Sequence, residues 1–241
     1  KDISFTKDVK PILDNRCVSC HSCYNSPCQL NLGSFAGLDR GASKDLVYAT
    51  RMKAANPTRL FVDALNTKEW RDKSFFSMTD KMEDTNASIM MQYLFEKDIN
   101  PKLEGKYSPE TDKLSCVKNK EELEDYLEVN PHKAMPYGFP GLSKNEYNTL
   151  MTWLDNGAID DTPKDVINDF EKAQIKKYED FFNDKSIKNK VTARYIYEHL
   201  FLAHISFDDN SKNFFQIIRS STPSGTEAKI IPTRLPYDEI K

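Results

Sequence analysis

The sequence predicts a mainly α-helical protein, and three observations carry that prediction. Apolar residues recur at the three- and four-residue spacing of amphipathic helices in several segments. A C-x-x-C-H motif follows the first of these segments, and a Met-Pro loop precedes a later one. The expected architecture is a helical domain with a long insertion over residues 1–160, followed by a helical segment over residues 161–241.

Length and composition exclude several classes of protein. The chain has 241 residues, of which 39% are hydrophobic and 29% charged, as expected of a soluble globular protein. A net charge of -3 gives no electrostatic reason to bind nucleic acid or anionic lipid. No segment approaches the roughly 18 apolar residues of a membrane span. The abrupt start at Lys1 is interpreted as a mature or trimmed N-terminus, with a targeting segment expected to have preceded it.

The first helix is expected to begin with Thr6 as its N-cap and to end near Asn15. Val9, Ile12 and Leu13 then lie on its buried face. The C-x-x-C-H motif follows directly. A short N-terminal helix that leads into such a motif is typical of the start of a cytochrome c.

The motif Cys17-Val18-Ser19-Cys20-His21 predicts covalent attachment of a c-type haem. Two thiols at this spacing can bond to the two vinyl groups of one haem, and the adjacent imidazole can bind the iron as its proximal ligand. Two alternatives stay open. Cys17, Cys20, Cys23 and Cys28 could supply four thiolates to zinc, or one cysteine pair could act as a redox dithiol.

Met135 is the first candidate for the distal iron ligand, because it lies next to proline in the loop of residues 131–138. His132, three residues earlier, is the alternative distal ligand. Five other methionines are interpreted as core side chains that fill irregular gaps: Met78, Met82, Met90, Met91 and Met151. His199 and His204, five residues apart, face different sides of a helix and are interpreted as structural.

A helix after this loop matches the end of a cytochrome c. Ser143 and Glu146 form a capping-box pattern, and Gly157 is placed to end the helix. The apolar face between them consists of Tyr147, Leu150, Met151 and Leu154. The motif and this helix together therefore predict a cytochrome c-like haem domain over residues 1–160.

Three cysteines remain beside the haem pair. A disulfide between Cys23 and Cys28 is the preferred pairing, and Cys28 with Cys116 is the competing one. Covalent haem and a disulfide both point away from the reducing cytosol, to a bacterial periplasm.

Elsewhere the apolar spacing predicts helices and short strands. The expected helices cover residues 43–54, 57–66, 86–97, 120–128, 163–183 and 190–205. The expected strands lie near residues 214–219 and 229–232.

Several blocks of sequence resemble the bacterial fatty acid cis/trans isomerase family, and they extend over essentially the whole chain. The blocks are residues 16–32, 40–44, 57–61, 135–138, 193–205, 219–220, 222–223 and 233–238. Cys116 has no place in the family pattern. The long spacing between His21 and Met135 also departs from small cytochromes c.

The resemblance implies an isomerase that converts cis-unsaturated acyl chains of membrane phospholipids to trans, with a c-type haem, in the periplasm of Gram-negative bacteria. Peripheral contact with the membrane is then expected. Family members are much longer, so the chain resembles an N-terminal fragment that leads into a missing C-terminal region and can bind haem yet lack activity. A periplasmic electron-transfer cytochrome is the alternative, and the sequence leaves the oligomeric state open.

Overall fold

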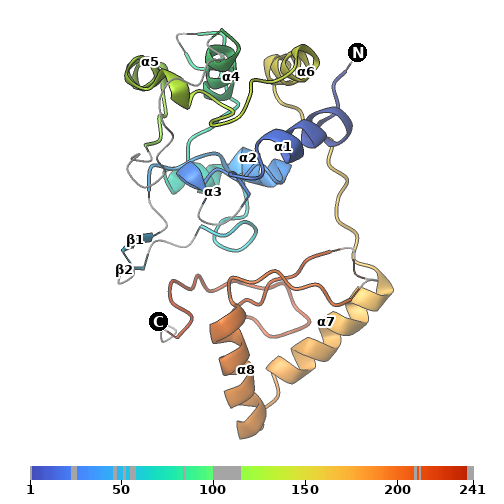
Figure 1. The fold of residues 1–241 in the computed structure, drawn as a ribbon. Helices are drawn as coiled ribbons and strands as arrows, with labels where there is room; N and C mark the ends of the chain where they lie inside the picture. The colour runs from blue at the N-terminus through green and yellow to red at the C-terminus, as the bar shows by residue number, and fades with distance from the viewer. Residues whose placement is uncertain are drawn as a thin grey trace. The chain divides into compact units, whose positions relative to one another are not determined.

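The structure is a computed structural model, and it is mainly helical, as predicted (Figure 1). It describes residues 2–22, 26–45, 48–50, 53–54, 58–83, 85–99, 115–208, 211 and 213–237. The chain forms two compact units. Unit 1 comprises residues 1–49 and 65–162, and unit 2 comprises residues 50–64 and 163–241.

The helices of unit 1 are short. They are a π-helical turn at Phe5–Val9, α1 (Lys10–Arg16), α2 (Phe35–Arg40), α3 (Thr67–Asp72), α4 (Ile89–Ile99), α5 (Lys120–Val129) and α6 (Lys144–Asp155), with 3₁₀ turns at Pro27–Gln29 and Pro131–Lys133. Strands β1 (Tyr48–Thr50) and β2 (Lys53–Ala54) pair with each other. Unit 2 contains α7 (Asp169–Phe182) and α8 (Ile187–Leu200). No helix in the described ranges is long and apolar enough to span a bilayer.

The core of unit 1 joins its N-terminal helix to α6. Phe5, Val9 and Leu13 are almost completely buried, as are Leu150 and Trp153 of α6. The rings of Phe5 and Trp153 lie 5.5 Å apart between centroids. The segment that carries the C-x-x-C-H motif is therefore held in place by burial of apolar side chains against a helix about 130 residues later.

The N-cap of the first helix differs from the prediction. Ser4, not Thr6, caps the helix by accepting a hydrogen bond from the backbone N–H of Lys7. Thr6 instead donates hydrogen bonds from its backbone N–H and its hydroxyl to Asp161, both at 2.8 Å. The hydroxyl of Thr6 is thus used in tertiary structure, while the same type of residue two positions earlier supplies the cap.

The helices predicted over residues 43–54 and 57–66 are wrong for the described residues within them. Part of the first segment forms β1 and β2. In the second, Asp63 accepts hydrogen bonds from the backbone and guanidinium of Arg59, which closes a turn. Arg59 also donates to the carbonyl of Phe201, so residues 58–64 pack within unit 2 rather than in the predicted first domain.

The helices with strong local signals are confirmed. Helices α4 and α5 lie close to the predicted ranges 86–97 and 120–128. Ser143 and Glu146 form the predicted capping box of α6, and Gly157 has a φ of +89°, as its place after the helix requires. The predicted strands near residues 214–219 and 229–232 are reduced to isolated bridges, Ile205 with Phe215 and Ser220 with Ile230.

Unit 2 is organised around buried polar groups. The carboxylate of Glu171 is fully buried and accepts hydrogen bonds from Ser211 and from the backbone and side chain of Asn213. A hydrogen bond from the backbone N–H of Asn168, together with these bonds, holds the pKa of Glu171 at about 2, against the cost of burial. Asn168 caps α7, so this helix begins several residues after the predicted start.

Candidate functional site

The C-x-x-C-H motif lies in a tight turn at the end of α1. The backbone N–H of Cys17 still donates to Leu13, and the N–H groups of Cys20 and His21 both donate to the carbonyl of Cys17. The carbonyl of His21 in turn accepts from Leu32 at 2.7 Å. This turn brings both cysteines and the histidine to the same side of the chain.

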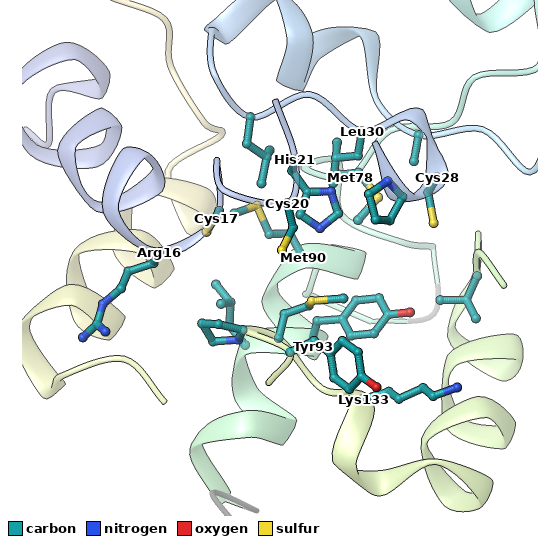
Figure 2. A pocket seen from close by; sticks show the side chains of 18 of the residues that line it. Arg16, Cys17, Cys20, His21, Cys28, Leu30, Met78, Met90, Tyr93 and Lys133 are labelled. Carbon is teal, nitrogen blue, oxygen red and sulfur yellow. The ribbon is translucent and has the colours of Figure 1, made fainter. Parts of the chain in front are cut away.

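These three side chains line a cavity of about 350 Å³ within unit 1 (Figure 2). Cys17, Cys20 and His21 lie along one wall, and Tyr93 and Lys133 lie along the opposite wall. Most of the lining is apolar, which suits a large flat apolar cofactor or an acyl chain. The remaining lining residues are Arg16, Pro27, Cys28, Leu30, Leu32, Ala42, Phe76, Met78, Met90, Leu94, Ser115, Val117, Tyr126, Met135, Pro136, Tyr137 and Phe139.

His21 is buried, with 9% of its surface exposed, and its Nδ1 makes no hydrogen bond of normal geometry with the described residues. Burial lowers the pKa of the imidazole, and the nearby carbonyls of Leu30 and Pro27 oppose that effect only in part. The ring is therefore neutral near pH 7, which is the form that binds a metal ion.

Cys17 and Cys20 are both free thiols. Burial, together with a smaller effect of the neighbouring Cys20, raises the pKa of Cys17 to about 11. A reactive redox dithiol needs the opposite, a lowered pKa on at least one sulfur. The environment of Cys17 therefore does not activate its own thiol in the way that a redox dithiol requires.

The disulfide differs from the preferred pairing. Cys28 is bonded to Cys116, with Cα atoms 5.6 Å apart and a separation of 88 positions in the sequence. The preference for Cys23 with Cys28 is wrong, since Cys28 is already bonded, and Cys23 itself lies outside the described residues. Folding brings residues 115–117 to the wall of the cavity beside Cys28, and this proximity decides the pairing. The zinc site with four thiolate ligands is also excluded, because the sulfur of Cys28 is in the disulfide and cannot bind zinc as a thiolate.

The structure brings Met135 to the same cavity as the motif. The peptide bond between Met135 and Pro136 is cis. His132, the alternative distal ligand, is not among the lining residues, and its ring lies 6.2 Å from that of Tyr137. Met78 and Met90 are buried in the core, as predicted. Both also line the cavity, so two further thioethers lie in the same cavity as Met135.

The two histidines of unit 2 lie in other surroundings. Nδ1 of His199 is 2.7 Å from the carbonyl oxygen of Tyr195, and Nε2 of His204 is 3.3 Å from the side-chain amide of Gln216. Both histidines are exposed.

Arg16, directly before the motif, forms a two-bond ion pair with Glu146 of α6, with both distances at 2.9 Å. The sequence predicted only the capping role of Glu146, because its partner lies 130 residues away. The hydrogen bonds from Arg16 and from the backbone of Ser143 hold the pKa of Glu146 at about 2, below its ordinary value of 4.5. This ion pair fixes the end of α1 against the start of α6.

Replacing Glu146 with glutamine is expected to lower the free energy of unfolding by about 1 to 2 kcal/mol at pH 7, because glutamine retains the capping box but not the ion pair. A lowered pKa in the folded state gives stability that is present above about pH 4.5 and is lost as the pH falls toward 2. Urea unfolding at pH 7 and pH 3 measures the difference between the wild type and the variant. An equal difference at both pH values would contradict this account.

The residues of the cavity fit a covalently bound haem. Two free thiols are available for attachment, a buried neutral imidazole is available for the iron, and the surrounding wall is apolar. Met135 lines the same cavity and is the candidate for a second ligand to the iron. Cys17, Cys20, His21 and Met135 are thus the residues that would hold the group.

Comparison with known proteins identifies the family. A family model described as fatty acid cis/trans isomerase matches residues 55–241. Searches of curated proteins and of solved structures gave no match. The matched range covers more than three quarters of the chain and begins after the C-x-x-C-H motif, so it provides evidence that is independent of the motif. The chain belongs to the fatty acid cis/trans isomerase family.

Proposed function

We propose that the protein isomerises cis-unsaturated acyl chains of membrane phospholipids to trans with a c-type haem attached to Cys17 and Cys20 and bound by His21. The family supplies the reaction, cis/trans isomerisation of fatty acids. The haem and the phospholipid substrate are the proposed additions.

One observation carries the proposal: the wall of the cavity combines the motif, which lies outside the matched range, with side chains from inside it. The disulfide from Cys28 to Cys116 and the ion pair from Arg16 to Glu146 each link the two parts. The motif is therefore built into the structure of the isomerase region. A separate electron-transfer module attached to an isomerase would not need these links.

Isomerisation requires rotation about a C=C bond, so the π component of that bond must be weakened for a moment. When bound, the haem would supply an iron centre able to accept electron density from the alkene. The apolar side chains of the wall would hold the acyl chain and exclude water. His21 would hold the iron, and Met135, which is half-buried in the same cavity, is the candidate second ligand.

We further propose that the protein works in the bacterial periplasm. The disulfide supports an oxidising compartment, and attachment of haem through two thioethers takes place in such a compartment.

Replacing both Cys17 and Cys20 with alanine tests this proposal. The wild type, produced with haem maturation, is expected to keep haem absorbance on the polypeptide after denaturation and to form trans phospholipids from cis-unsaturated vesicles. The double variant is expected to lose both. Ser19→Ala is the matched control, because it changes an exposed residue of the same motif and leaves both attachment thiols and His21 in place. Full isomerase activity without attached haem would contradict the proposal.

A further inference from the structure

Helix α8 has one face buried within unit 2. Ala193, Ile196 and Tyr197 lie on this face, and Tyr197 is 7% exposed. The guanidinium of Arg219 lies 4.6 Å from the centroid of the Tyr197 ring, and the ring of Phe201 follows at 6.2 Å. Helix α8 also contacts α7, the preceding helix of the same unit (Figure 1). These contacts fix the rotation of α8 about its axis.

The opposite face of α8 carries an exposed apolar stripe. Ile187, Val191 and Tyr195 are 83%, 65% and 61% exposed. They follow one another at intervals of four residues, so each lies about 40° further around the helix than the one before. The centre of this stripe lies about 190° around the axis from the centre of the buried face. A helix that is apolar on both sides is unusual in water and marks a surface for interaction.

Basic side chains flank this stripe. The segment from Lys185 to Arg194 holds four basic residues and no acidic residue. By helical position, Lys188 lies at one edge of the stripe, and Lys190 and Arg194 lie at the other. The Lys185, Lys188 and Lys190 side chains are exposed and long enough to reach past the apolar side chains. Glu198 shares this face, and its charge is offset by Arg194 at 2.7 Å.

We propose that this stripe docks unit 2 onto an anionic phospholipid bilayer, with α8 lying in the plane of the interface. An apolar stripe that contains an aromatic ring and is bordered by lysines is the pattern of interfacial amphipathic helices. The net charge of -3 does not oppose this inference, because attraction to lipid headgroups depends on local charge within about 10 Å. The proposal rests on the proposed function, in which the substrate is a membrane phospholipid.

Co-flotation of the purified chain with vesicles of saturated phosphatidylcholine and phosphatidylglycerol tests the proposal. Binding is expected with phosphatidylglycerol present, and it should weaken when the salt concentration rises. Replacing Lys188 and Lys190 with glutamine is expected to lower binding by about 30-fold. Replacing Ile187, Val191 and Tyr195 with serine is expected to lower it by about 100-fold or more.

Val166→Ser is the matched control, because Val166 of the same unit is 78% exposed and lies outside α8. It should bind vesicles as the wild type does. Circular dichroism should show an unchanged helix content in all variants, since every substituted side chain is exposed. Wild-type binding by the serine variant would overturn the proposal, and so would a stripe that mediates self-association in solution without affecting vesicle binding.

Saturated lipids separate this inference from the proposed function, because they have no double bond to isomerise. Loss of turnover on vesicles by the serine variant, with full turnover on detergent-dispersed cis-unsaturated lipid, would support docking and leave the function intact. Vesicle binding by a chain that turns over neither substrate would support docking and count against the function.

Discussion

Replacing His21 with alanine is expected to reduce the formation of trans phospholipids by about 100-fold or more. Loss of a group that only orients a metal ligand already costs about 10- to 100-fold, so loss of the ligand itself should cost at least as much. His21 is the imidazole that the turn after α1 brings to the wall of the cavity, buried and neutral. Gas chromatography of the acyl chains after incubation with cis-unsaturated vesicles measures the loss.

Two further variants serve as controls for His21. His132→Ala is expected to keep both haem absorbance and activity, because His132 does not line the cavity. Met135→Leu is expected to remove the sulfur-to-iron charge-transfer band and keep the attached haem, whereas Met78→Leu and Met90→Leu should keep the band. Unchanged trans-lipid formation by His21→Ala would remove the haem from the mechanism, and loss of the band in Met90→Leu in place of Met135→Leu would reassign the distal ligand.

Replacing Cys116 with serine is expected to lower the free energy of unfolding by about 4 to 5 kcal/mol. The disulfide to Cys28 closes a loop of 88 residues, and the entropy that a bond over such a loop removes from the unfolded chain is of this size. In a domain of 150 to 250 residues, such a change lowers the melting temperature by about 10 °C or more. Thermal unfolding followed by circular dichroism measures it.

The double variant, with both Cys28 and Cys116 replaced by serine, is the control for this effect. It should be as unstable as Cys116→Ser, because either change removes the same bond. Cys20→Ser should unfold as the wild type does when both lack haem, since Cys20 is exposed and is not in a disulfide. A melting temperature that Cys116→Ser leaves unchanged would contradict the disulfide.

The sequence was most informative where neighbouring residues determine the structure. The capping box of α6 depends on two residues three positions apart, and it was predicted. Helix α2 was missed because six residues give little periodic signal. The end of α2 depends on a distant contact that the local sequence does not contain. Gly41 follows α2 with a φ of +82°, and a β carbon at this position would overlap the carbonyl oxygen of Phe76, which accepts a hydrogen bond from the backbone N–H of Ala42.

Contacts between distant parts of the chain explain the other differences. Spacing alone favoured Cys23 as the partner of Cys28, whereas folding places Cys116 beside it. The ion pair between Arg16 and Glu146 was missed because the two residues are 130 positions apart and Glu146 is already explained by the capping box of α6. The sequence alone was enough to name Cys17, Cys20, His21 and Met135 as site residues, but it was not enough to predict the apolar residues that surround them in the cavity. The cytochrome c-like character of unit 1 stays a prediction.

The dependence of isomerase rate on haem occupancy tests the central claim most directly. Preparations of the wild type with different fractions of covalently attached haem would be incubated with the same cis-unsaturated phospholipid vesicles. The proposed function predicts a rate of trans-phospholipid formation that rises in proportion to attached haem and reaches zero in the haem-free protein. An equal rate in haem-free and fully loaded preparations would contradict it.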